Sequence, residues 1–253
     1  VNGVAVELNQ SAFTWGRRFV AQQKKVLALL PKPTSTQLTS LDDIVADREA
    51  RLVSYQSKDY AALYTRRIRT VEKRLNHLPD NSALLCDIAR QLYRLMALKD
   101  EYEVARILTT DDEPDGIPKL NRAGINFYFA PPVLSQWWSS QGRPKKIRIS
   151  AWARLPLKVL AGLKFVRGTA MDVFAYTDER RAERADLADY LADIDLIGEM
   201  AIIESMDSAQ QLANAPAKLK GYGHVRTRSR TTWLEQRNRC RAELQLVQPL
   251  NVT

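Results

Sequence analysis

The chain has few of the residues that usually form cross-links or cofactor sites. Its 253 residues include only two cysteines, Cys86 and Cys240, and two histidines, His77 and His224. The cysteines lie far apart, which excludes a disulfide framework, and two lone thiols are typical of a reducing cytoplasm. No CxxC occurs, and neither histidine has a Cys or His at ligand spacing. We therefore expect no structural zinc site and no cysteine-held iron–sulfur cluster in this chain.

Glycine and long apolar runs are also scarce. Ten glycines in 253 residues are too few for a Gly-rich all-β sandwich. The apolar stretches are short and interrupted by charges, so we expect no transmembrane helix. The sequence does not begin with a basic region followed by an apolar stretch, the pattern that indicates a signal peptide. We therefore predict a cytoplasmic protein. The chain begins Val1-Asn2-Gly3 without an initiating Met, from which we expect a piece of a longer protein.

Catalytic and phosphate-binding patterns are missing as well. No GxSxG occurs, and residues 221–223 (Gly-Tyr-Gly) lack the third glycine of a dinucleotide loop. His224 follows this turn; a structural role there is favoured over a general acid or base. Asp186, Asp189 and Asp193 share a helix face and could hold magnesium. We favour a solvated acidic face, because no second carboxylate cluster accompanies them.

What the sequence does have is an uneven distribution of charge. The net charge is +9; residues 116–171 contain ten basic and no acidic residues, and residues 172–210 contain eleven acidic ones. Residues 218–241 are basic again, with Glu235 their only acid. These blocks either neutralise one another in the fold, which we favour, or form a basic surface for an anionic partner. The candidate anion or partner contacts are Arg143, Lys145, Lys146, Arg148, Arg167 and His224.

The acid-free run is interleaved with aromatic residues, and this combination can follow phosphates and stack bases. No RNP, zinc-finger or homeodomain pattern accompanies it. Aromatic residues in a helical protein usually lie in the core. The sequence therefore does not favour nucleic acid as the partner.

Apolar periodicity predicts a mainly α fold with long amphipathic helices. We expect a helix in residues 1–30, a Pro/Ser/Thr-rich linker at 31–39 and a helical domain over 40–253. Ser40 has the features of an N-cap, with Asp42 and Asp43 in the first turn. The long helix that follows can break at residues 56–58, and its apolar stripe includes Leu63.

Further helices are expected along the rest of the domain. Residues 82–96 show a helical stripe, which can continue to Leu108. A strand pattern at 125–129 predicts one small β-hairpin with residues 147–149. The remaining helices are predicted at 151–166, from the N-cap Thr177 onward, at 208–220 and at 225–247.

Several short segments of the sequence, which we call strings, carry a family resemblance that amino-acid composition alone does not explain. In order, they are residues 2–7 with 12–17, 99–106, 129–134 with 142–146, 163–169, 176–181 and 221–226. Together they resemble the C-terminal region of fused, indolepyruvate-type 2-oxoacid:ferredoxin oxidoreductases. The first resembles the end of the γ-type domain that precedes this region, so residues 1–30 would be the tail of that domain.

The resemblance implies a parent enzyme that oxidatively decarboxylates an arylpyruvate or another 2-oxoacid to an acyl-CoA and passes electrons to ferredoxin. Such enzymes use thiamine diphosphate, iron–sulfur clusters and CoA. The thiamine-binding motif and the cluster cysteines are absent here, so no catalytic, cofactor-binding or metal residue carries over. The resemblance therefore implies a non-catalytic accessory domain that packs against the upstream catalytic domains of the same polypeptide or their dimer mate. Its basic run could face ferredoxin or the CoA phosphates.

Two further interpretations concern the polar residues of this domain. The close spacing of Lys99, Asp100, Glu101, Tyr102 and Arg106 predicts a buried charged network that fixes the orientation of a helix. The alternative from a different functional class is a stand-alone basic helical module that binds nucleic acid or protein.

Overall fold

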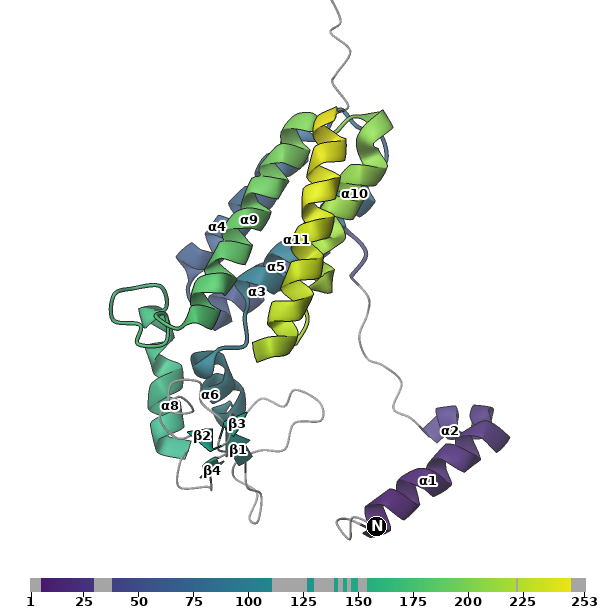
Figure 1. Ribbon diagram of the computed structural model, residues 1–253, viewed down its shortest axis with the longest axis vertical. Helices are drawn as coiled ribbons and strands as arrows, with labels where there is room; N and C mark the ends of the chain where they lie inside the picture. Colours follow the sequence, from purple (N-terminus) through teal and green to yellow (C-terminus); the bar gives the residue numbers. More distant parts are fainter. Residues whose placement is uncertain are drawn as a thin grey trace, which may run out of the picture. The chain divides into compact units, whose positions relative to one another are not determined.

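A computed structural model describes residues 6–29, 38–110, 154–221 and 223–246, together with four short strands between 127 and 149 (Figure 1). The described residues are mainly helical, as the sequence predicted. Contacts divide the chain into two units, Val1–Leu38 and Thr39–Thr253. Among the described helices, none is both long and apolar enough to cross a membrane.

The described part of the first unit contains two helices where the sequence predicted one. They are α1 (Val6–Ala21) and α2 (Gln23–Leu29), and the helical backbone is interrupted at Gln22. The large apolar side chains of α1 are exposed, since Leu8, Trp15 and Phe19 are each at least 40% accessible, and neither helix has a buried residue. The linker predicted at 31–39 falls largely outside the described residues.

The second unit begins with two helices separated by a short break. These are α3 (Leu41–Tyr55) and α4 (Lys58–Arg74). The Ser40 hydroxyl accepts from the Asp43 amide at 3.1 Å, which confirms the predicted N-cap. The predicted break is also confirmed, because Ser57 caps α4 in the same way. Leu63 departs from the predicted stripe and is 54% exposed.

The helix that follows ends earlier than the sequence allowed. Helix α5 (Ser82–Met96) carries the predicted apolar stripe, but the chain leaves the helix at Ala97 and restarts as α6 (Glu101–Thr109). The continuation from 96 to 108 as one helix is therefore wrong. The reason is Asp100, whose extended backbone and side chain cap α6 by accepting from the Glu103 amide at 2.7 Å.

Four short strands follow. Strand β1 (Phe127–Phe129) pairs antiparallel with β4 (Ile147–Ile149), and β2 (Ser139–Ser140) pairs with β3 (Arg143–Pro144). The residues that connect these strands lie outside the described part, so the hairpin as a whole stays a prediction. The chain then forms α8 (Arg154–Gly162), with Pro156 in its first turn, and the short 3₁₀ helix η2 (Leu163–Val166).

The rest of the unit is a helical layer. Helix α9 (Asp178–Met200), capped by Thr177 as predicted, is followed by η3 (Ile203–Ser205), α10 (Met206–Asn214), η4 (Ala215–Lys218) and α11 (Gly223–Leu246). In Figure 1, α9 and α11 lie side by side and run in the same direction. Helices α4, α5, α9 and α11 share a core whose largest fully buried side chains include Tyr64, Ile68, Leu92, Tyr190, Ile194 and Trp233.

Candidate functional site

A buried ion pair joins the start of α6 to the turn after η2. The Arg167 guanidinium donates to both carboxylate oxygens of Asp100, from Nε at 2.5 Å and from Nη2 at 2.7 Å. Its third nitrogen, Nη1, donates to the main-chain carbonyl of Tyr55 at the end of α3. Both charged residues are only 8% exposed. A bidentate pair of this kind fixes orientation as well as distance.

The surroundings of this pair use its remaining hydrogen-bonding capacity. Asp100 also accepts from the Tyr55 hydroxyl at 3.2 Å and from the Glu103 amide that it caps. The Arg167 guanidinium lies over the Tyr55 ring at 3.8 Å and near the Tyr102 ring at 5.3 Å, which adds cation–π attraction. Burial, with a further contribution from the Asp100 charge, raises the pKa of the Tyr55 phenol. The pair is thus fully engaged by protein groups.

A second buried carboxylate, Asp172, organises the loop between η2 and α9. It accepts from the Tyr102 hydroxyl at 3.1 Å and from the main-chain amides of Gly168 and Phe174, each at 3.2 Å. Gly168 has φ +73°, a left-handed conformation that glycine adopts without steric cost. Burial and the bond to Asp172 raise the pKa of Tyr102 to about 12. This loop is therefore anchored directly to α6.

The first turns of α9 are tied to the same place. Arg180 donates to Glu101 on α6 at 3.0 Å and to Glu183 at 2.6 Å. Glu183 is only 5% exposed, and this burial raises its pKa although Arg180 opposes the shift. Burial alone would lower the pKa of Arg180, but Glu183 and Glu101 raise it above its usual value. The two side chains form a partly buried ion pair that joins the first turns of α9 to α6 through Glu101.

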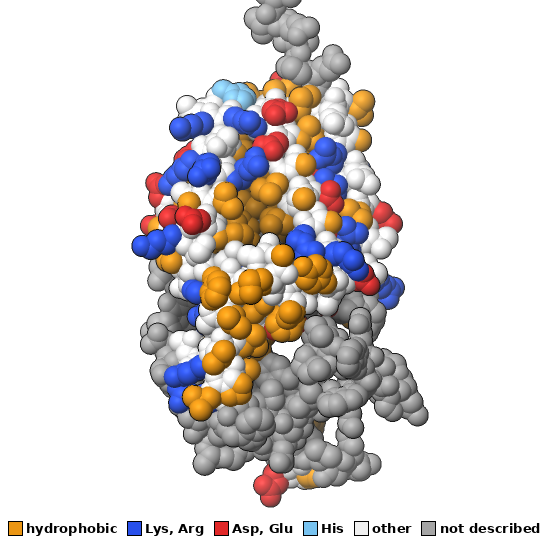
Figure 2. All heavy atoms as spheres, turned by 90° about the vertical axis from the view of Figure 1, so that its left-hand side faces the viewer, with side chains coloured by type: hydrophobic (Ala, Val, Ile, Leu, Met, Phe, Trp, Pro, Cys, Tyr) orange, Lys and Arg blue, Asp and Glu red, His pale blue; other side chains and the backbone are white. Residues whose placement is uncertain are grey.

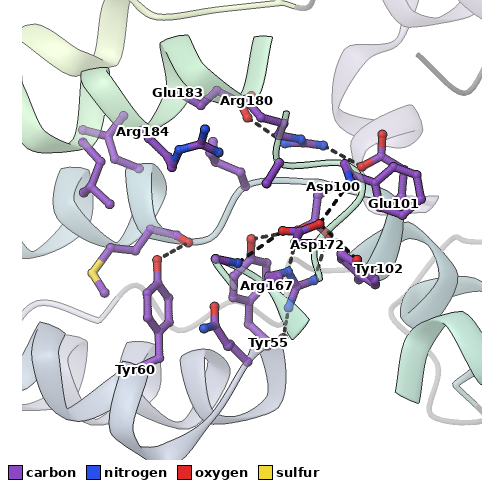
Figure 3. Close-up of a pocket in the computed structure, with 18 residues that line it drawn as sticks. Tyr55, Tyr60, Asp100, Glu101, Tyr102, Arg167, Asp172, Arg180, Glu183 and Arg184 are labelled. Atoms are coloured by element: carbon purple, nitrogen blue, oxygen red, sulfur yellow. Dashed lines mark hydrogen bonds and ion pairs between the residues drawn. The ribbon is translucent and has the colours of Figure 1, made fainter. Parts of the chain in front are cut away.

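These groups form one wall of a cavity of about 260 Å³ (Figure 3). The opposite wall is apolar and comes from the end of α5 and from α9. Arg184 also lines the cavity, one helical turn after Arg180 on α9. The apolar lining residues include Leu95, Met96, Leu98, Phe174, Ala175 and Leu187.

The structure brings together three of the five residues predicted to form a charged network. Asp100, Glu101 and Tyr102 belong to the cluster around the cavity. Arg106 instead binds Glu103 on its own helix, at 2.8 and 2.7 Å, and Lys99 is exposed beside the cluster. Sequence reasoning missed four members. Tyr55, Asp172, Arg180 and Glu183 carry no shared spacing with residues 99–106, although Arg180 lies in one of the strings that carry the resemblance.

Arg167 corrects one expectation from the sequence. It was a candidate contact for an anion or a partner, but the structure buries it against Asp100, so its charge is already neutralised. For the other candidates the structure describes the backbone at most. The backbones of Arg143 and Arg148 lie in β3 and β4, and that of His224 in the first turn of α11. Their side chains lie outside the described part, as do Lys145 and Lys146.

The predicted solvated acidic face of α9 is also wrong. Asp186 is fully buried and Asp193 is 1% exposed. Each lies between two arginines of α11: Arg226 (3.0 Å) and Arg230 (2.5 Å) bind Asp186, and Arg237 (2.6 Å) and Arg241 bind Asp193. Because burying an unpaired carboxylate is costly, these side chains can leave water only together. For these two blocks, the prediction that opposite charges neutralise one another is confirmed.

The arrangement offers little for catalysis. Within the described ranges, no group of three or more His, Cys, Asp or Glu side chains lies where it could hold a metal ion. The buried carboxylates of the cluster accept from arginines, tyrosines or main-chain amides. What the site does is hold α3, α6, α9 and the loop before α9 in one arrangement.

Comparisons with known proteins give one family. A family model described as a family of unknown function, DUF6537, matches residues 41–239. No curated protein and no solved structure matches the chain.

Proposed function

We propose that this chain, which belongs to the family of unknown function DUF6537, is a non-catalytic accessory domain of an indolepyruvate-type 2-oxoacid:ferredoxin oxidoreductase. The parent enzyme would be cytoplasmic and would convert an arylpyruvate or another 2-oxoacid to an acyl-CoA. Thiamine diphosphate, iron–sulfur clusters and CoA would be bound by other domains of the same polypeptide.

A non-catalytic role is supported by the contacts that residues in the resembling strings make, because these contacts hold the fold together. Three of these strings contribute residues to the hydrogen-bonded cluster around Asp100 and Arg167. They are residues 99–106, 163–169 and 176–181. String 221–226 supplies Arg226 to buried Asp186. It also supplies Gly221, with φ +77°, where a Cβ would lie 2.6 Å from Val225. The residues at these positions stabilise the fold. Under this proposal, the catalytic residues belong to other domains.

The surface for packing against the catalytic domains would be an apolar patch that we call the α8 patch. Figure 2 shows hydrophobic side chains grouped on the side of the second unit that carries α8. Exposed apolar patches commonly mark contacts with other proteins. The α8 patch consists of Leu155, Val159, Phe165, Met171, Val173 and Tyr176, each at least 63% exposed.

The first test uses the coding sequence upstream of Val1 and the chain itself. The proposal expects an open frame that encodes the thiamine and γ-type domains. In isothermal titration calorimetry, the chain should give no heat with thiamine diphosphate. Micromolar binding of thiamine diphosphate, or a stop codon and start site just upstream, would contradict the proposal.

The second test concerns the α8 patch. The catalytic part of the parent enzyme, supplied as a separate chain, should bind this chain in a pull-down. Phe165→Asp and Met171→Asp should weaken binding, because each places a charge in the buried contact. Leu246→Asp is the matched control, since Leu246 is 81% exposed on α11. Equal binding by all three variants would remove the α8 patch from the interface.

The competing function, a stand-alone nucleic-acid-binding module, predicts affinity that falls steeply with salt. The pairing of four α11 arginines with buried aspartates disfavours it, because those charges are not available to phosphates. A salt titration with single-stranded and duplex DNA and RNA distinguishes the two. Measurable binding with a steep slope would support the module and oppose the accessory domain.

A further inference from the structure

The cavity beside the Asp100–Arg167 pair has two walls of different character. On one side, each buried charge has its partner within the protein, as described above. On the other side lie apolar side chains from α5 and α9, together with the rings of Tyr60 and Phe174. Pockets that bind small molecules are mostly apolar with a few polar groups and typically measure about 300–1,000 Å³. A cavity of about 260 Å³ lies just below this range and therefore suits only a small ligand.

One cation of the cavity has no counter-ion among the residues that the structure describes. Three arginines line it: Arg167 is bound to Asp100, and Arg180 to Glu101 and Glu183. Arg184 makes no hydrogen bond or ion pair with any described residue. In Figure 3 its guanidinium extends from α9 toward the middle of the cavity, with no dashed line to a neighbour.

The geometry points to a binding site for a small organic anion, one that carries a single carboxylate and a flat apolar body. Arg184 would bind the carboxylate through its fork of N–H donors. The apolar body would lie against Met96, Leu187 and the Phe174 ring. No assigned function covers this site, and it does not depend on the parent enzyme proposed above.

Access and selectivity follow from the same residues. Arg184 is exposed, and Leu187 and Phe174 are only partly buried, so the apolar side of the cavity opens to solvent. The Tyr60 hydroxyl is occupied by the Met96 carbonyl at 3.1 Å, and burial raises the pKa of Tyr60 to about 12, so its ring presents a neutral face. A cationic ligand would meet Arg184 without a free carboxylate to compensate. The site therefore selects anions.

The test is an NMR titration of the ¹⁵N-labelled chain with benzoate. Benzyl alcohol serves as the uncharged analogue, and inorganic phosphate as the anion without an apolar body. Benzoate should shift the amide signals of residues 96–98, 174–175 and 184–187 along a saturating curve. Benzyl alcohol and phosphate should each bind at least about tenfold more weakly, since each lacks one half of the recognition.

Variants of Arg184 locate the anion. Arg184→Gln should weaken benzoate binding about tenfold, because it removes a charged hydrogen-bond donor. Arg184→Lys should retain most of the affinity, because it keeps the charge. Arg228→Gln, the same change at an exposed position of α11, should leave binding unchanged. The proposal is overturned if benzoate causes no saturable shift, if Arg184→Gln binds as well as the unchanged chain, or if benzyl alcohol or phosphate binds as tightly as benzoate.

Discussion

Two regions of the second unit bury charge in different ways. Around Asp100, one carboxylate meets one arginine, and the donors come from α3, α6 and the turn after η2. Between α9 and α11, Asp186 and Asp193 each lie between two arginines four residues apart. The first region joins segments of the chain that are distant in sequence. The second repeats one contact along two parallel helices.

The difference concerns redundancy. Arg167 has a single carboxylate partner and is 8% exposed, so it has no route to water if that partner is lost. Arg230 and Arg241 keep 30% and 27% of their side-chain surface accessible. Because a partly exposed arginine can be rehydrated, the α9–α11 interface should tolerate damage better than the Asp100 pair.

The largest effect should come from Asp100→Ala. It leaves the Arg167 charge buried, removes the cap of α6 and frees the Tyr55 hydroxyl, so we expect a loss of about 5 kcal/mol in the free energy of unfolding. Urea unfolding measures this. Asp178→Ala is the control, since its exposed pair with Arg181 should contribute less than about 1 kcal/mol. Equal effects of the two variants would mean that the Asp100 pair is not a structural joint.

A smaller loss is expected from Asp186→Asn. The amide keeps a hydrogen-bond acceptor but leaves Arg226 and Arg230 without a buried counter-charge, which should cost about 3 kcal/mol. Asp189→Asn on the same helix is the matched control, because Asp189 is 36% exposed and its contact with Arg237 is 3.4 Å long. If Asp186→Asn destabilised the protein as much as Asp100→Ala, the contrast in redundancy would fail.

Arg226→Gln tests redundancy directly. Asp186 keeps Arg230 at 2.5 Å, so we expect a loss of only about 1 kcal/mol in urea unfolding. Arg228→Gln, an exposed change on the same helix, should be neutral within about 0.5 kcal/mol. A loss for Arg226→Gln as large as that for Asp186→Asn would show that both arginines are required.

The smallest effect at neutral pH concerns Tyr60 and Tyr102. Burial raises the pKa of each to about 12, above the ordinary value of about 10. The folded state therefore favours the neutral phenols, and this stabilisation is complete below pH 10 and is lost as the pH rises to 12. Each tyrosine should contribute a decline of about 1.4 kcal/mol per pH unit in that window.

Unfolding of the unchanged chain and of Tyr60→Phe at pH 8 to 12 measures the decline. The variant should lose about 1 kcal/mol at pH 8, where the hydrogen bond to Met96 is missing. Above pH 10 its stability should fall less steeply than that of the unchanged chain. Parallel curves would show that Tyr60 titrates normally.

Local signals predicted much of the fold. The caps at Ser40 and Thr177, the break at residues 56–58 and the stripe of α5 depend on neighbours within a few residues, so they are visible in the sequence. The extension of α5 to residue 108 was wrong because helical periodicity continues through Asp100, whereas its cap interrupts the backbone there. Leu63 shows the same limit of helical periodicity. An apolar residue at helical spacing is buried only where another segment packs against it, and Leu63 is exposed.

The candidate site was less predictable. Asp100, Glu101 and Tyr102 stood out by their spacing, but Asp172 and Arg180 come from other segments and have no pattern in common with them. The aspartates of α9 were misassigned to solvent for a related reason. Their spacing defines a face of the helix, and only the position of α11 decides whether that face meets water or arginine.

The sequence by itself determined the helical class, the main caps and the opposite charges of residues 172–210 and 218–241. Those properties follow from local hydrogen bonding, periodicity and composition. The tertiary structure alone decided that Arg167 is a buried tie and that Asp186 and Asp193 are interior. It also decided that Arg184 faces a cavity and has no counter-ion within the described part of the chain. These outcomes depend on contacts between segments distant along the chain, where desolvation and pairing set the free energy.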